Sequence, residues 1–198
     1  KRYWIQSNRL MRIISGNFRG KKILLPKDKK TRPLRDSLKE SIFNIIEHSP
    51  LINFKFENSK VLDLFSGVGS FGLECISRGT EHVTFVEKYS EAMIILKKNI
   101  NSLNCPDKIS IFETDILQPN GFNKFKVKEF DLIFLDPPFK ETNIDYIIKN
   151  IYKFEILKKN GLILIHRNKI SKDKFPEKFK ILIEKKYGIS KIIFGKLN

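Results

Sequence analysis

The chain has few of the residue types that build disulfide frameworks or metal sites. Its two cysteines, Cys75 and Cys105, lie far apart, and its three histidines, His48, His82 and His166, are not spaced as metal ligands. We therefore expect no metal site and free thiols in a reducing compartment.

Long apolar runs are also absent, since none approaches the roughly 18 residues of a membrane-spanning helix. Residues 1–6 lack the hydrophobic core of a signal peptide, so we expect a cytoplasmic protein without membrane contact. With 41% hydrophobic residues, 198 residues suffice for one core and a small appendage. We interpret residues 1–10, which precede Met11, as a non-native or upstream extension, residues 11–30 as a basic β-hairpin and linker, and residues 31–198 as one domain.

Positive charge is abundant and uneven. The formal net charge is +16, and residues 1–35 hold twelve Lys or Arg against a single acid, Asp28. Lysine-rich coding bias is an alternative explanation, but such a bias would spread lysine evenly. The concentration at one end predicts a surface for a polyanion, and nucleic acid is the partner we expect.

Residues 61–74 have the pattern of a buried strand, a glycine turn and a helix start. Gly67, Gly69 and Gly72 match G-x-G-x-x-G, and Glu87 ends the next apolar run as a ribose-binding acid would. In a dinucleotide fold, however, Asp63 would repel the pyrophosphate. An acid there suits a cationic ligand such as the ammonium of S-adenosylmethionine. A tight turn with a solvated acid is the plain alternative.

A second apolar strand, 130–135, leads directly into Asp136-Pro137-Pro138-Phe139. Two prolines end the strand and stiffen a loop at its carboxyl edge, where open α/β sheets bind ligands. This tetrapeptide resembles the D/N-P-P-Y/F motif of amino-group methyltransferases. Asp136 and the Pro137 carbonyl would hold the two N–H groups of a base amine, and Phe139 would stack on the base.

The basic N-terminal segment predicts a β-hairpin, with strands at 12–14 and 22–25 around a Gly- and Asn-containing turn. An edge ribbon that only packs on the core is the alternative. Residues 32–46 predict a helix with an apolar face, capped by Asp36 or Ser37 and ending before Pro50. The RNA-binding candidates that we draw from these two segments are Arg12, Phe18, Arg19, Lys21, Lys22, Arg32 and Arg35.

Together these stretches resemble one family, the RsmD-type bacterial small-subunit (16S) rRNA guanine-N2 methyltransferases. The resemblance covers about residues 11–197 and rests on the 12–23 segment, the 32–44 helix start, the 63–74 turn, Glu87 and the Asp136-Pro-Pro-Phe139 loop. There are departures. Leu34 and Lys39 stand where the family usually has Thr and Arg, and His166-Arg167 ends the fifth expected strand where an acid is frequent.

The resemblance implies a Rossmann-like α/β class I methyltransferase fold, with a seven-stranded, mostly parallel sheet that has one antiparallel strand, plus the N-terminal hairpin. Apolar periodicity agrees with it. Strands are expected near 60–65, 82–87, 108–113, 130–136, 161–166, 179–184 and 189–194, and helices near 70–78, 89–102 and 143–153.

The resemblance also implies S-adenosylmethionine as cofactor and small-subunit rRNA, or the assembling small subunit, as partner, with transfer to a guanine 2-amino group. A monomer is our default expectation. Asp115 would contact the adenine amine and Ile116 its ring, although Asp115 also suits an ordinary helix cap. The implied catalytic residues are Asp136, Pro137 and Phe139. The implied cofactor-binding residues are Asp63, Phe65, Ser66, Gly67, Gly69, Glu87, Lys88, Asp115, Ile116 and Asp136.

Two alternatives remain at this stage. One is a DNA amino-methyltransferase acting on adenine N6 or cytosine N4, which shares the D/N-P-P-Y/F motif. The other is a non-catalytic nucleic-acid-binding or NAD-binding module with the same fold. Substrate trials with DNA and rRNA, and titration with S-adenosylmethionine against NAD, separate the three.

Overall fold

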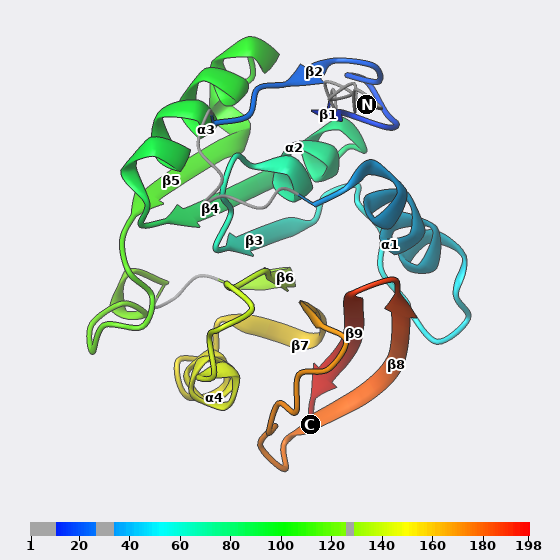
Figure 1. The fold of residues 1–198 in the computed structure, drawn as a ribbon, viewed down its shortest axis with the longest axis vertical. Coiled ribbons are helices and arrows are strands. Elements are labelled where there is room, and N and C mark those ends of the chain that lie inside the picture. The colour runs from blue at the N-terminus through cyan, green and yellow to red at the C-terminus, as the bar shows by residue number, and fades with distance from the viewer. Residues whose placement is uncertain (1–10, 27–33, 126–128) are drawn as a thin grey trace, which may run out of the picture.

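The computed structural model describes residues 11–26, 34–125 and 129–198. Its main feature is a seven-stranded sheet in the order β5-β4-β3-β6-β7-β9-β8, which runs down the view in Figure 1. Every pairing from β5 to β7 is parallel, and β9 alone is antiparallel to both of its neighbours. The strands are β3 (Lys60–Leu64), β4 (His82–Glu87), β5 (Ile109–Glu113), β6 (Phe130–Leu135), β7 (Leu157–Asn168), β8 (Phe179–Tyr187) and β9 (Ser190–Leu197).

The sheet confirms the expected fold class, and all seven expected strands are present. The largest difference is at β7, which begins at Leu157 rather than near 161. Lys158-Lys159-Asn160-Gly161 reads as a turn, and Asn160 does have a positive φ of 70°. The strand nevertheless continues through it, because Leu157 pairs with Phe130 across an irregularity in the register.

Helices cover both faces of the sheet because its central strands are buried on both sides. Adjacent residues Val61 and Leu62 of β3 belong to different apolar clusters, one on each face. One cluster includes residues of α1 (Asp36–His48), α2 (Ser70–Ser77) and α3 (Ser90–Leu103). The other includes α4 (Ile144–Lys153) and the loop that carries Phe122 and Phe125. In the described part of the chain, no helix is long and apolar enough to cross a membrane.

Strand order reverses at β3, which lies between β4 and β6. The next strand along the chain, β4, pairs with one edge of β3, and β6 pairs with its other edge. Leu64 and Leu135, the last residues of β3 and β6, are paired in register. The segments that leave these two strands therefore start side by side, at the position where open α/β sheets bind ligands.

The N-terminal hairpin forms a separate two-stranded ribbon, β1 (Met11–Arg12) with β2 (Lys22–Ile23), that lies beside α2 in Figure 1. Its strands are shorter than expected because the segment between them bonds to α2. The Asn17 amide donates to the Ser77 carbonyl at 2.8 Å. Gly16 has a φ of +78°, and a Cβ there would lie 1.8 Å from the same carbonyl oxygen, so only glycine fits.

A buried ion pair joins the hairpin to α1 and α2. The Lys39 ammonium lies 3.7 Å from the Glu74 carboxylate, both side chains are 0% exposed, and Lys39 also donates to the Arg12 carbonyl at 2.7 Å. Glu74 accepts the amides of Ile14 and Ser15 at 2.7 and 2.9 Å. Burial lowers the pKa of Lys39 despite its acidic partners.

The capping expectation for α1 was wrong. Arg35 occupies the N-cap position and makes no side-chain cap bond, while Asp36 is the first helical residue. The Asp36 carboxylate lies 3.6 Å from the Lys39 ammonium instead. Its charge is thus directed to the buried cation rather than to the free amides of the first turn.

Candidate active site

The turn between β3 and α2 brings backbone close to a ligand space. Phe65, Gly67 and Gly69 all have positive φ, at 62°, 54° and 84°. A Cβ on Gly69 would lie 2.5 Å from Leu96 Cδ1, so the position requires glycine for space as well as conformation. The Ser66 amide donates to the Val86 carbonyl at 3.0 Å and ties the turn to β4.

This turn and the loop that follows β6 open into one cavity of about 540 Å³. The cavity brings together nine of the residues expected to form the site. They are Asp63, Phe65, Ser66, Gly67, Glu87, Lys88, Asp136, Pro137 and Phe139. Leu34, just before α1, and His166, near the end of β7, also line it, so five separate parts of the chain meet there.

Asp63 is the most perturbed acid of this cavity. It is 1% exposed; its Oδ2 accepts the Gly72 amide at 3.0 Å, while its buried Oδ1 has no hydrogen-bond partner among the residues that the structure describes. Burial raises the pKa of Asp63 well above its usual value, and the charges of Asp136 and Glu87 add to the effect against the Gly72 bond. A cationic donor group on a ligand would supply the missing partner.

Glu87 supports the backbone around the turn. One carboxylate oxygen accepts the Gly67 amide at 2.7 Å, and the other accepts the amides of Lys88 and Tyr89 at 2.9 and 2.8 Å. Two carboxylate oxygens offer about four lone-pair positions, so one position remains for a ligand hydroxyl. Glu87 therefore fixes the turn and the start of α3 at once.

Asp136 enters the cavity from the opposite side. Its backbone amide donates to the Leu64 carbonyl at 3.3 Å, and its Oδ1 lies 2.8 Å from His166 Nδ1. The other His166 nitrogen lies 2.9 Å from Ser190 Oγ, on β9. The Asp136 side chain stays 19% exposed toward the cavity, so one oxygen is held and the other is accessible.

Comparison with known proteins identifies the family. The model described as Conserved hypothetical protein 95 matches residues 11–196. The chain belongs to this family, which is the RsmD-type family that its motifs resemble. Ribosomal RNA small subunit methyltransferase D of Haemophilus influenzae is 33% identical over 183 residues, 90% of each chain. The protein of that name in Buchnera aphidicola subsp. Baizongia pistaciae is 35% identical over 159 residues, 79% of this chain and 76% of the relative.

Solved structures give the same result for the fold. HI0767 of Haemophilus influenzae, a candidate methylase, is 30% identical with a TM-score of 0.72, over 94% of this chain and 97% of that one. SMU.776, a candidate methyltransferase complexed with SAH, is 18% identical with a TM-score of 0.62, over 80% of this chain and 48% of that one. At that identity the second likeness concerns the fold alone.

Three residues expected at the cofactor site do not line the cavity of this RsmD-type chain. Gly69 lies behind the turn, against Leu96. Ile116 is 2% exposed and belongs to the apolar cluster of α4. Asp115 accepts the Leu117 amide at 3.0 Å and pairs with Lys88 at 3.0 Å. Burial opposes ionisation of Asp115, but these bonds together lower its pKa.

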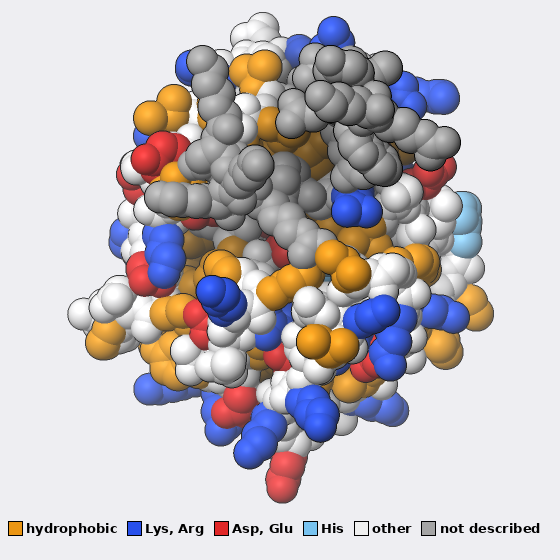
Figure 2. All heavy atoms as spheres, viewed as in Figure 1, with side chains coloured by type: hydrophobic (Ala, Val, Ile, Leu, Met, Phe, Trp, Pro, Cys, Tyr) orange, Lys and Arg blue, Asp and Glu red, His pale blue; other side chains and the backbone are white. Residues whose placement is uncertain are grey.

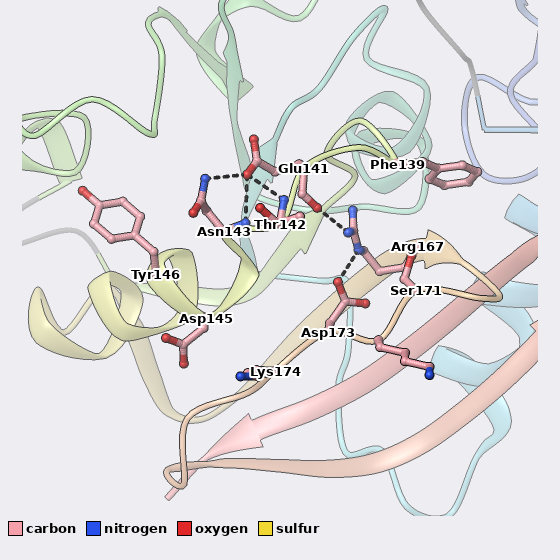
Figure 3. Close-up of a pocket in the computed structure, with 11 residues that line it drawn as sticks. Phe139, Glu141, Thr142, Asn143, Asp145, Tyr146, Arg167, Ser171, Asp173 and Lys174 are labelled. Carbon is pink, nitrogen blue, oxygen red and sulfur yellow. Dashed lines mark hydrogen bonds and ion pairs between the residues drawn. The ribbon is translucent and has the colours of Figure 1, made fainter.

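The loop that follows β6, residues 136–143, is here called the acceptor loop. The side chain of Arg167 holds it in place. Figure 3 shows its side chain between Asp173 and this loop. Arg167 is 2% exposed; it donates to the Pro138 and Glu141 carbonyls and to the Asp173 carboxylate. A second cavity of about 520 Å³ lies there, and it shares Phe139 and Glu141 with the first. The guanidinium fork thus fixes the loop that separates the two spaces.

The RNA-binding candidates differ in their exposure to solvent and in their contacts. Arg12, Arg19, Lys22 and Arg35 are exposed, whereas Arg32 lies outside the described residues. Phe18 is half-buried against the core, and Lys21 donates to the Ser102 carbonyl near the end of α3. Figure 2 shows further Lys and Arg side chains interspersed with acidic and apolar ones over the lower half of one face.

His166 and Arg167 are the site residues that the sequence did not reveal. The signals were their positions near the end of an apolar strand and their departure from the acid that is frequent there in the family that the sequence resembles. Among the described residues, no group of three or more His, Cys, Asp or Glu side chains has the arrangement of a metal site.

Proposed function

We propose that this chain is an S-adenosylmethionine-dependent methyltransferase that modifies the 2-amino group of a guanine in small-subunit rRNA. The observation that carries the proposal is the shared cavity, with Asp63 on one side and Asp136 on the other. Relatives named as small-subunit rRNA methyltransferases support the substrate class. The guanine 2-amino group is our inference from the acceptor loop and from the family resemblance.

The residues around the glycine turn fit this cofactor. The unpartnered Asp63 Oδ1 suits the ammonium of the amino-acid moiety, and Glu87 keeps one lone-pair position for a ribose hydroxyl. The glycines let the backbone approach the ligand. The fold neighbour with bound SAH supports a cofactor of this class in such a sheet. When bound, S-adenosylmethionine supplies a methyl group already activated on a sulfonium.

The acceptor loop supplies orientation. An exocyclic base amine is a poor nucleophile because its lone pair is delocalised into the ring. Asp136 Oδ2 would accept one N–H and the Pro137 carbonyl the other, which turns the lone pair toward the donor side of the cavity. Asp136 would then receive the proton that the amine loses after methylation. Phe139 would stack on the base that is turned out of the RNA.

Orientation of this kind can lower a barrier by several kcal/mol, so loss of Asp136 should reduce transfer by at least about 100-fold. The test uses purified protein, labelled S-adenosylmethionine and small-subunit rRNA, with mass mapping of the methylated nucleotide. Asp136→Ala should bind the cofactor and transfer no detectable methyl group. Asp131→Ala is the matched control, because Asp131 lies on the same strand and pairs with Lys158 and the Lys60 amide instead.

The result also decides between substrates. Methyl transfer to DNA but not to rRNA would contradict the proposal and support a DNA amino-methyltransferase. Transfer to an rRNA position other than guanine N2 would support the rRNA methyltransferase activity but contradict the guanine 2-amino group as the methyl acceptor. Normal modification by Asp136→Ala would reject the role given to that carboxylate.

A further inference from the structure

His166 is a buried imidazole with three contacts. Two of them are to the acceptor loop, and the third is to Ser190 on β9. It is 5% exposed; Nδ1 lies 2.8 Å from Asp136 Oδ1, and Nε2 lies 2.9 Å from Ser190 Oγ. Its ring also makes a T-shaped contact with the Phe139 ring, with centroids 5.5 Å apart and planes at 78°. One side chain of β7 therefore touches Asp136 and Phe139, two of the three residues that would hold the target base.

The partners of His166 define its tautomer. An ionised Asp136 carboxylate can only accept, so Nδ1 must carry the proton and donate it. The neutral ring then has its lone pair at Nε2, where the Ser190 hydroxyl can donate. Ser190 is 5% exposed and is the first residue of β9, so the ring is held between two strands of the sheet.

This arrangement fixes the plane of the Asp136 carboxylate. With Oδ1 bonded to the ring, Oδ2 is the oxygen left for the cavity, where the carboxylate stays 19% exposed. Within the described residues, the hydrogen bonds of the Asp136 side chain run to His166 and to no other side chain. Without the imidazole, the carboxylate would rotate about its own bonds and lose the single orientation that the target amine needs.

We infer that His166 is a positioning residue for methyl transfer, acting through Asp136 and through the Phe139 ring. The inference rests on the proposed function, and it assigns a role to the end of β7. An acid at this position would face Asp136 with a like charge, whereas the imidazole N–H faces it as a donor.

Two matched substitutions separate the two ring nitrogens. The amide nitrogen of Asn in His166→Asn falls near the position of Nδ1, so it can still donate to Asp136. The longer His166→Gln reaches the Nε2 position and Ser190 but leaves Asp136 without its donor. We expect His166→Asn to keep kcat within about threefold of wild type and His166→Gln to lose about 10- to 100-fold.

The loss should appear in kcat and not in the KM for S-adenosylmethionine, because His166 contacts the acceptor side. Ser190→Ala should stay within about threefold, since it leaves the Nδ1 bond in place. Equal losses in the Asn and Gln variants would indicate a merely structural role and overturn the inference. So would an unchanged kcat in His166→Gln.

Nitrogen NMR of the imidazole tests the pairing without any turnover. We expect the Nδ1–H tautomer in the wild-type protein and its loss in Asp136→Ala. An Nε2–H tautomer in the wild type would overturn the inference even if the enzyme methylates rRNA. If the wild type methylates no RNA but shows the Nδ1–H tautomer, the proposed substrate fails while the His166–Asp136 contact stands.

Discussion

Asp63 and Asp136 face one cavity from neighbouring parallel strands, and the charge of Asp136 disfavours ionisation of Asp63. Asp63 pairs in register with Phe134, two residues before Asp136, and the Asp136 charge contributes to the raised pKa of Asp63. The protein thus holds an acid that is costly to ionise until a cation arrives. That cost links cofactor binding to pH.

Cofactor affinity should rise with pH through the range in which free Asp63 loses its proton. An ammonium beside Asp63 favours its ionised form, so binding at lower pH must release the Asp63 proton. Calorimetry of S-adenosylmethionine binding, in buffers with different ionisation enthalpies, measures that release. Asp63→Asn should abolish the proton release and weaken binding. Asp107→Asn, at an acid outside the cavity, should change neither.

Asp63 should also make the free protein less stable at higher pH. Because its folded pKa is raised above the unfolded value, its contribution to stability is fully present below the unfolded pKa and is lost as the pH rises through the folded pKa. Asp63→Asn should therefore narrow the difference in melting temperature between acidic and alkaline buffer. Thermal unfolding without cofactor checks this, and an unchanged difference would contradict it.

Gly69 and Gly20 form a matched pair, since both have a φ of +84°. A Cβ on Gly20 meets nothing within 4 Å, so Gly20→Ala should cost only the left-handed strain, about 1 kcal/mol in unfolding free energy. A Cβ on Gly69 would collide with Leu96, so Gly69→Ala should cost about 2 kcal/mol more. Urea unfolding measures both values. Equal costs would show that crowding against α3 is not what requires glycine at the turn.

Removal of the buried Lys39 charge should loosen the hairpin. Lys39→Ala leaves the Glu74 carboxylate without one of its buried partners, so we expect a loss of about 3 kcal/mol in unfolding free energy. Proteolysis within residues 11–26 should also become faster. Lys149→Ala breaks the exposed pair with Asp145 and should cost less than about 1 kcal/mol. Similar costs in the two variants would contradict the anchoring role.

The exposed arginines and lysine of the hairpin should contribute to RNA affinity and not to cofactor affinity. We expect each of Arg12→Ala, Arg19→Ala and Lys22→Ala to reduce the salt slope of rRNA binding by about 1. Lys180→Ala is the control, because Lys180 is exposed near the start of β8, at the rim away from the cavity. Filter binding over a salt series gives the slopes. A changed salt slope in the Lys180 variant, with unchanged slopes in the hairpin variants, would show that rRNA binds to a surface other than the hairpin.

The sheet was predictable because strands covered on both faces must be apolar throughout. β3 and β6 show such runs, and their carboxyl ends carry the two motifs. The common cavity could be expected from that placement together with the family resemblance. The orientation of individual side chains could not, because it depends on contacts between residues that lie far apart in the sequence.

Lys39 and His166 illustrate the limit of what the sequence alone can predict. Lys39 lies four residues before Phe43, in the same stripe of α1 that is buried, but a lysine on a helix normally marks the solvent side. Its burial follows from Glu74, which reaches it from α2. His166 gains its role from Asp136 and Ser190, which lie 30 and 24 positions away. Neither set of contacts produces a local sequence pattern from which it could be predicted.

The insertion of β9 between β7 and β8 has a consequence for the order of assembly. A ribosome releases β8 before β9, yet β8 joins the sheet only through β9. Until β9 arrives, β7 presents an open edge, and His166 lacks Ser190. The antiparallel pair of β8 and β9 therefore closes this edge of the sheet and supplies the Ser190 partner of His166 at the same time.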